Sequence, residues 1–257
     1  IFGSNDWAYY ILSQIFVIIA FVFVWKLSNE FFEDKKLSLI SVLLLEVIVF
    51  YNYTTPEFNV NVSQLPFWSM SIYFFWKGIN NKKIINWILF GIFSAFGFLS
   101  KYLFIYILFS LFLFLIFNFK KYRSIIQNYF ISVIISITIL IPHFIWLFNN
   151  DFITIKYAFS RAGLEEVSYI KHLKFPIIFL IKQVLILLPI LIMLSLILKK
   201  IKIDLNLNDR KLYFLLIINI LPILLVLLTS IITGSKIRTM WMTPFYLFFG
   251  TLLIYIF

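Results

Sequence analysis

The chain has 257 residues, of which 63% are hydrophobic and 13% are charged, and its formal net charge is +11. A soluble domain is about half apolar and about one quarter charged, so a soluble fold of this length could not bury so much apolar surface. The basic residues form short clusters between apolar segments, which is typical of membrane loops and excludes a continuous nucleic-acid-binding stripe. Cysteine is absent, which excludes disulfides and thiolate zinc sites, and the two histidines, His143 and His172, are too far apart to indicate a histidine metal site.

Several apolar segments have the length of membrane helices, which need about 20 mostly apolar residues and fewer when flanking groups snorkel. Their apolar stretches are continuous, unlike the alternating strands of a membrane barrel. The expected spans are residues 8–28, 37–53, 62–79, 84–100, 102–119, 124–148, 173–198, 212–233 and 241–257. The sequence therefore predicts an all-α integral membrane protein, a multi-span bundle of about nine transmembrane helices that forms a single domain over residues 1–257.

The segments 84–100 and 102–119 could form two spans or one long helix. Ser100 and Lys101 would then lie in the middle of the membrane, at a cost of a few kcal/mol. A tight hairpin at Lys101 avoids this cost, so we expect two spans here.

The two ends of the sequence indicate whether it is a part of a longer protein. Residue 1 is Ile, no signal-peptide pattern precedes the first apolar segment, and the last apolar segment continues to Phe257. We therefore expect a chain that is truncated at both ends. The heavy use of Ile, Phe, Lys and Asn favours a bacterial source.

The distribution of Lys and Arg predicts the orientation in the membrane. One set of loops, with Lys26, carries roughly twice as many basic residues as the other, so the positive-inside rule places that set in the cytoplasm. The cytoplasmic loops are expected at residues 29–36, 77–83, 118–123 and 199–211. The outer loops are expected at residues 53–62, 149–172 and 234–239. The outer loops hold carboxylates, amides and isolated cations, so chemistry is expected on the outer face.

The first outer loop has the sequence TTPEFNVNV at residues 54–62. Pro56 ends a helix, and Glu57, Asn59 and Asn61 then follow at alternate positions, so they would face one way in an extended stretch. A carboxylate and two amides suit sugar hydroxyls or a bound cation. The alternative is a solvated turn with a helix cap, since loops are polar by default.

Three further outer charges are candidate binding residues. Lys101 is the only charged residue in the turn between two very apolar spans, where it could hold a lipid phosphate as a point charge or serve as a snorkelling anchor. Asp151 and Arg161 bracket an outer loop that contains aromatic residues. All three are expected to contact substrate.

A pair of cations, Lys236 and Arg238, lies in a short loop before Trp241. Cations beside an aromatic residue at the membrane interface suit a phosphate, whereas the alternative for Trp241 is the ordinary aromatic belt. Glu46 and Lys182 lie inside expected spans, where ionisable residues are functional candidates by default; pairing with each other or with the backbone is the alternative.

Two negative observations narrow the chemistry. Pro142-His143 near an outer helix end indicates a kink with a hydrogen-bonded histidine rather than a catalytic one. No phosphate-binding glycine loop, HExxH or GxSxG sequence is present, which excludes an NTPase, a zinc metalloprotease of that type and a serine hydrolase of that type.

The ordered outer motifs resemble a known family. They are TTPEFNVNVSQLPFWSMSIYFFWKGI, NWILFGIFSAFGFLSKY, IPHFIWLFNNDF, a SRAG loop and GSKIRTMW. In this order they resemble the polyprenyl-phosphate-sugar-dependent glycosyltransferases of family 39 type, relatives of the protein O-mannosyltransferases and lipid A aminoarabinose transferases in the C superfamily. The resemblance covers nearly the whole chain.

The resemblance implies a membrane glycosyltransferase of the hexosyl- or pentosyl-transferase type. Its donor would be a polyprenyl-phosphate sugar, its acceptor a lipid, a glycan or a protein, and its active site would face the periplasm from a bacterial inner membrane. Membrane lipid is an expected partner and nucleic acid is not. No cofactor is certain; a divalent cation stays open, and the sequence does not identify a metal.

The resemblance also assigns roles to residues. Glu57 occupies the place of the family's second acidic residue, with Pro56 before it where the family commonly has a proline after it, and Lys101 falls in the family's Ser-Lys-Tyr-like turn. The family's base is the Asp of an Asp-Glu pair in the first outer loop. Asp6 is the only acid before the first span and lacks an adjoining Glu, so a helix-terminus role suits it better. We therefore expect the catalytic Asp upstream of Ile1, with Glu57 as a supporting acid.

Two expectations complete the sequence-based description. Glu57, Lys101, Arg161, Lys236 and Arg238 are expected to converge on one outer cavity, since lipid-facing surface would penalise their charges. The alternative function is a transporter or flippase of lipid-linked sugars, which should show two similar halves with interrupted helices. No such symmetry is visible in the sequence.

Overall fold

The computed structural model describes residues 5–164, 168–197, 206 and 208–257, and within these ranges it contains helices and no strand. The α-helices are α1 (Asp6–Phe31), α2 (Lys35–Leu43), α3 (Val49–Asn52), α4 (Val60–Asn81), α5 (Ile84–Ser100), α6 (Ile105–Phe117), α7 (Phe119–Tyr122), α8 (Ile126–Asn149), α9 (Ile153–Arg161), α10 (Lys171–Ile197), α11 (Arg210–Thr233) and α12 (Phe249–Ile256). The 3₁₀ helices are η1 (Leu44–Val47), η2 (Tyr102–Phe104), η3 (Arg123–Ile125) and η4 (Thr239–Tyr246). The prediction of an all-helical membrane protein is confirmed.

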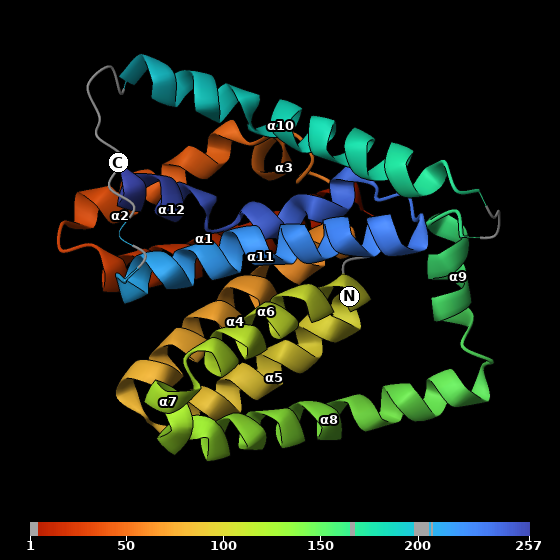
Figure 1. The fold of residues 1–257 in the computed structure, drawn as a ribbon, viewed down its shortest axis with the longest axis horizontal. Helices are drawn as coiled ribbons and strands as arrows, with labels where there is room; N and C mark the ends of the chain where they lie inside the picture. The colour runs from red at the N-terminus through yellow and green to blue at the C-terminus, as the bar shows by residue number, and fades with distance from the viewer. Residues whose placement is uncertain (1–4, 165–167, 198–205, 207) are drawn as a thin grey trace.

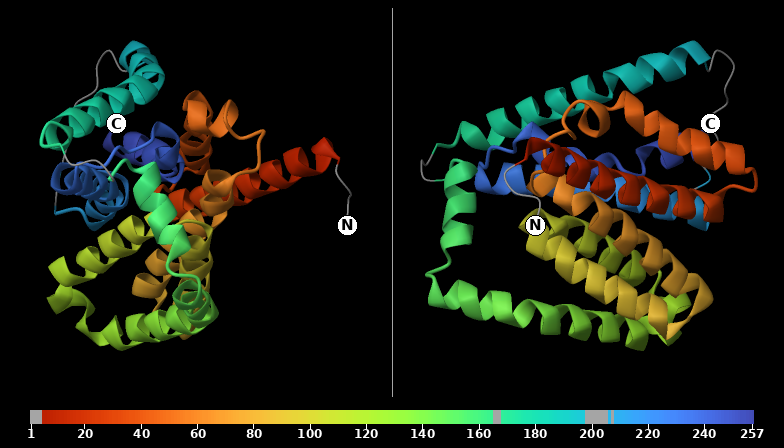
Figure 2. Two further views of the ribbon diagram at one scale, coloured as in Figure 1. Left: turned by 90° about the vertical axis from the view of Figure 1, so that its right-hand side faces the viewer. Right: turned by 180° about the vertical axis from the view of Figure 1, so that it is seen from behind.

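The long helices pack side by side, and the short helix α9 lies across them (Figure 1). Helix α4 packs against α1 and α5, α5 against α8, and α6 against α11. Helices α2 and α12 form a second pair beside α1, and α10 packs on α11. Figure 2 shows that α8 and α10 lie on opposite sides of the molecule and that α9 stands between their ends.

An aromatic cluster holds the central helices together. The ring of Trp76 in α4 lies between Phe31 of α1, at a centroid distance of 4.8 Å, and Phe214 of α11, at 4.7 Å. Phe75 and Phe114 also pack on the ring of Phe214. All five side chains are buried. Aromatic pairs of this kind contribute about 0.5–1.5 kcal/mol beyond the area that they bury, so this cluster fixes how α1, α4, α6 and α11 pack together.

The expected number of nine spans is not supported. In the part of the chain that the structure describes, four helices are long and apolar enough to cross a membrane, and a pair bent by 54° makes a fifth if it is one span. The four are Asp6–Phe31, Phe119–Asn149, Lys171–Met193 and Arg210–Thr233, and the bent pair is Thr239–Tyr246 with Phe249–Ile256.

Four of the expected spans fail, for three separate physical reasons. The segment 37–53 is interrupted at Ile48, whose backbone is extended (φ −87°, ψ 122°), so that α2 has nine residues and α3 has four. Helices α5 and α6 are apolar but have only 17 and 13 residues, short of the ~20 that a bilayer requires. Helix α4 is long enough with 22 residues, but it carries amide and hydroxyl groups that lower its hydropathy.

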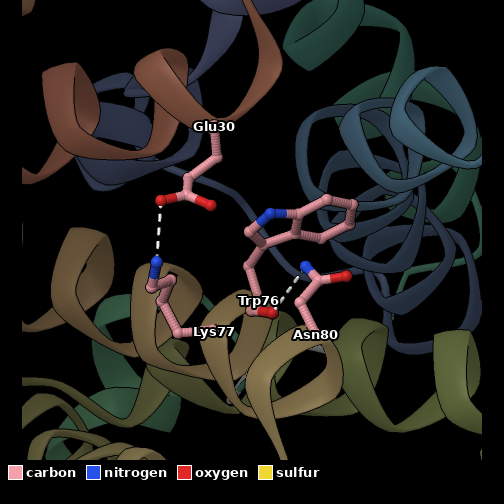
Figure 3. A network of polar contacts seen from close by, with 4 residues as sticks. All are labelled: Glu30, Trp76, Lys77 and Asn80. Carbon is pink, nitrogen blue, oxygen red and sulfur yellow. Dashed lines mark hydrogen bonds and ion pairs between the residues drawn. The ribbon is translucent and has the colours of Figure 1, made fainter.

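The loops gather at two opposite ends of the bundle. At one end, which we call the basic end (residues 30–36, 77–83, 118–123 and 208–211), Lys77 forms an ion pair with Glu30 at 2.8 Å, drawn in Figure 3 beside Trp76 and Asn80. Arg210 donates to Asn80 Oδ1 at 2.7 Å. The loops expected in the cytoplasm therefore lie together, except for residues 199–205 and 207, which are outside the described ranges.

The other end, which we call the cavity end, holds residues 53–62, 100–106, 150–164 and 234–243. The Tyr51 hydroxyl donates to Thr243 O at 2.6 Å, Ser13 donates to Thr55 O, and Gln64 donates to Lys101 O at 3.1 Å. These bonds join segments that are far apart in the sequence. The segments expected on one side of a membrane therefore meet at one end of the bundle.

Candidate functional site

A cavity of about 1120 Å³ lies at the cavity end. Four separate segments form its wall: residues 53–62, the turn at residues 100–106, helix α9, and residues 240–243 of η4. Tyr10 of α1 closes the wall. The cavity therefore draws on elements from most of the chain length and depends on the packing described above.

The cavity brings five of the eight predicted site residues together. Glu57, Asn59, Asn61, Lys101 and Arg161 line it, from three different elements of the wall. Glu57 and Arg161 are exposed, whereas Asn61 is buried. The cavity lining does not include Asp151, Lys236 or Arg238.

The loop before α4 corrects the expectation of an extended stretch with three aligned side chains. Helix α4 begins at Val60, so Asn61 already lies in its first turn. Asn59 caps this helix: its Oδ1 accepts from Asn61 N at 2.9 Å and from Val62 N at 3.3 Å, and its Nδ2 donates to Glu57 O at 3.1 Å. The helix-cap interpretation therefore describes Asn59, and Glu57 and Asn61 are left as the polar groups that can face a ligand.

Lys101 is the half-buried cation of the cavity. It links α5 to η2 in an extended conformation (φ −166°, ψ 132°), and its backbone oxygen accepts from Gln64. Its Nζ donates to Asn61 Oδ1 at 2.5 Å and lies 5.1 Å from the centroid of a Trp241 ring. A snorkelling anchor would instead point outward, so the side-chain direction favours the phosphate-binding interpretation.

The electrostatic state of Lys101 follows from these surroundings. The one ion pair among the described residues is Lys77 with Glu30, at the opposite end of the bundle. Burial lowers the pKa of Lys101 to about 7, because desolvation disfavours the ammonium form and no carboxylate compensates. An anion that entered the cavity would restore the charged form.

Arg161 contributes a second cation to the cavity wall, from helix α9. It lies at the end of α9, where its guanidinium carbon is 5.7 Å from the centroid of the Tyr157 ring. The backbone N of Lys236 donates to Ala162 O at 2.8 Å, so the 234–238 loop contacts the end of α9 through its main chain. The Lys236 side chain is exposed. The cation beside Trp241 is therefore Lys101, and not the Lys236–Arg238 pair that the sequence suggested.

Asp151 lies in the turn between α8 and α9, outside the cavity. It and Phe152 adopt the left-handed region (φ 49° and 56°) where the chain turns from α8 into α9. Asp tolerates this region better than most residues. The Asp151 side chain is exposed and does not line the cavity. The expectation that it contacts substrate is therefore not supported by its position.

The remaining ionisable candidates do not join the cavity. Glu46 and Lys182 are both exposed and form no ion pair in the described structure. Asp6 is the first residue of α1, as the helix-terminus interpretation expected. His143 shares a hydrogen bond of 2.8 Å with the Tyr102 hydroxyl, which confirms the hydrogen-bonded histidine. Within the described ranges, no group of three or more His, Asp and Glu side chains could hold a metal ion.

Sequence reasoning missed the aromatic lining of the cavity. Tyr10, Tyr53, Tyr102, Tyr106 and Tyr157 all line it. Aromatic residues make up 21% of the chain, and 14 of them are Tyr, so no local feature separates these five from the rest. Only their position in three dimensions does.

The comparisons with known proteins yield one match. A family described as dolichyl-phosphate-mannose-protein mannosyltransferase matches residues 1–146. The matched part is more than half of the chain, and it includes Glu57, Asn61 and Lys101 but not α9. The search of curated proteins and the search of solved structures each gave no match.

Proposed function

We propose, since the chain belongs to the dolichyl-phosphate-mannose-protein mannosyltransferase family, that its cavity is where a sugar leaves a polyprenyl-phosphate donor for an acceptor hydroxyl. Membership of the family makes the chain a membrane glycosyltransferase of the mannosyltransferase type. The acceptor hydroxyl would belong to a lipid, a glycan or a protein.

The observation that carries this proposal is Lys101, a half-buried cation in a large cavity that pairs with no carboxylate of the described residues. In the transfer, the bond between the anomeric carbon and the phosphate oxygen breaks, and a bond from the acceptor oxygen to that carbon forms. The phosphate takes the bonding electrons, so a cation placed beside it stabilises the charge that develops. Lys101 is suited to this role.

Glu57 and Arg161 would contact the substrate elsewhere in the same cavity. The acceptor hydroxyl loses its proton, and a carboxylate within hydrogen-bond reach can accept or orient that proton. Glu57 is the one carboxylate among the described residues that line the cavity, which supports its role as the supporting acid. Arg161 offers a fork of donors that suits phosphate or sugar oxygens.

The face of the membrane is also part of the proposal. The basic end carries most of the described Lys and Arg clusters, which supports a cytoplasmic location for that end. The cavity end would then face outward, which is the periplasm in a bacterial inner membrane. Val60, Val62, Leu103 and Ile105 add apolar surface to the cavity, as an isoprenoid chain next to the phosphate requires.

The test is sugar transfer by the full-length protein in membrane vesicles, from a purified mannosyl-phosphate polyprenol to an acceptor extract. Lys101→Ala should lower kcat/KM about 100-fold, the effect of removing one group that stabilises transition-state charge. Lys83→Ala, an exposed lysine at the basic end, should leave it unchanged. Equal losses in both variants would refute the role of Lys101. Movement of the donor across the membrane without transfer would instead support a transporter.

A further inference from the structure

Helix α9 forms one wall of the cavity although no side chain of it is buried. It has nine residues and contributes Tyr157, Ala158 and Arg161 to the lining. It stands across the ends of α8 and α10 (Figures 1 and 2). Short helices are only marginally stable without packing, so contacts near its two ends must determine where α9 lies.

Each end of α9 makes a hydrogen bond to a different segment. Near its start, Thr154 Oγ1 lies 2.7 Å from the Tyr102 hydroxyl. After its last residue, Ala162 O accepts from the backbone N of Lys236 at 2.8 Å. The second bond is between main-chain groups, so the first is the one that a side chain controls.

The Tyr102 hydroxyl connects three elements. Besides Thr154 it contacts His143 Nε2 of α8 at 2.8 Å. A hydroxyl has one hydrogen and two acceptor lone pairs, so it can donate to one neighbour and accept from the other. The Tyr102 ring packs on Phe98 with centroids 5.2 Å apart, and the next residue in the chain towards the N-terminus is Lys101.

We propose that Tyr102 is a positioning residue, whose hydroxyl fixes α9 relative to the Lys101 turn and so sets where Tyr157 and Arg161 lie in the cavity that Lys101 also lines. The argument for the placement of α9 needs only the contacts above. Its consequence for donor binding rests on the proposed function. If both cations contact the donor, loss of the hydroxyl should raise the donor KM more than it lowers kcat.

The experiment measures the position of α9 directly. Residues 1–257 contain no cysteine, so Ala158→Cys on α9 and Val60→Cys at the start of α4 provide the two spin-label sites of this part of the chain. The measurement uses the full-length protein in lipid nanodiscs, with any cysteine outside these residues replaced by serine. The distance distribution from pulsed electron resonance should be narrow in the parent. It should broaden in Tyr102→Phe and in Thr154→Val, and the double variant should match Tyr102→Phe, because both changes remove the same bond.

The control is Tyr53→Phe, which removes a hydroxyl of the same cavity that has no hydrogen bond in the described structure. It should leave the distribution unchanged. Unchanged distributions in both Tyr102→Phe and Thr154→Val would overturn the proposal, and Thr154→Val alone decides it if Tyr102→Phe fails to fold. Broadening with unchanged transfer kinetics would support the placement of α9 by Tyr102 and overturn the role of Arg161 in the proposed function.

Discussion

At the scale of single residues, the pH dependence of donor use should depend on Lys101. Its pKa of about 7 lies below the ordinary value of a lysine because of burial. The ammonium form dominates below that pH and is lost as the pH rises through it. If the donor phosphate binds the ammonium form, the donor KM should rise about tenfold between pH 6 and pH 8, and bound phosphate should raise the pKa.

The measurement is the donor KM as a function of pH, in the parent and in Lys101→Arg. Arginine stays charged throughout this range, so the variant should have a flat profile even if its affinity is lower. A flat profile in the parent would contradict the assignment, as would an equally steep profile in Lys101→Arg.

The residues of the site were predictable to different degrees. Glu57, Asn61 and Lys101 stand out in the sequence because each interrupts apolar sequence in a short polar turn, and the structure places all three at one cavity. Lys236 and Arg238 show the same pattern, yet neither lines the cavity, and the backbone N of Lys236 donates to Ala162 O at the end of α9. The direction of a side chain in a loop depends on the packing of that loop, which spacing along the sequence does not contain.

At the scale of elements, the close contact between α5 and η2 positions the Lys101 turn. Gly97 lies against the buried ring of Phe104, and a Cβ at Gly97 would lie 2.2–2.5 Å from three ring atoms. Gly97→Ala should therefore lower stability by about 1–3 kcal/mol, the usual cost of overpacking, with a lower Tm in thermal unfolding.

The paired variant Phe104→Leu makes this prediction specific. Leucine removes the ring atoms that the new methyl group would meet, so Gly97→Ala/Phe104→Leu should be more stable than the sum of the single effects indicates. Strict additivity of the two changes would show that the two residues do not meet.

The apolar pattern predicts where the helices lie better than it predicts where they break. The hairpin at Lys101 was predicted from the cost of a charge in the membrane, and the structure turns there. The break at Ile48 was not predicted. Leu, Ile and Val suit a continuous helix, a short 3₁₀ turn and an extended residue equally well, so the apolar segment 37–53 gave no indication of its break.

At the scale of the whole molecule, the two ends of the bundle have different chemistry. The basic end is held by contacts such as Lys77 with Glu30 and Arg210 with Asn80, whereas Glu57 and Arg161 at the cavity end form no salt bridge with any residue that the structure describes. Charges that are not paired with each other are available to a substrate. The cavity end combines an exposed carboxylate and an exposed guanidinium with a large cavity, which suits binding and chemistry at that end of the bundle.

The last prediction assigns these ends to the two sides. Because the chain has no cysteine, Tyr53→Cys at the cavity end and Asn81→Cys at the basic end provide single labelling sites; Tyr53 is 80% exposed and Asn81 is exposed. In intact bacterial cells, a membrane-impermeant maleimide should label Tyr53→Cys, and Asn81→Cys should react only after the membrane is opened. The reverse pattern would place the cavity in the cytoplasm and contradict the positive-inside assignment. Equal labelling of both sites in intact cells would contradict a bundle whose two ends lie on opposite sides of the membrane.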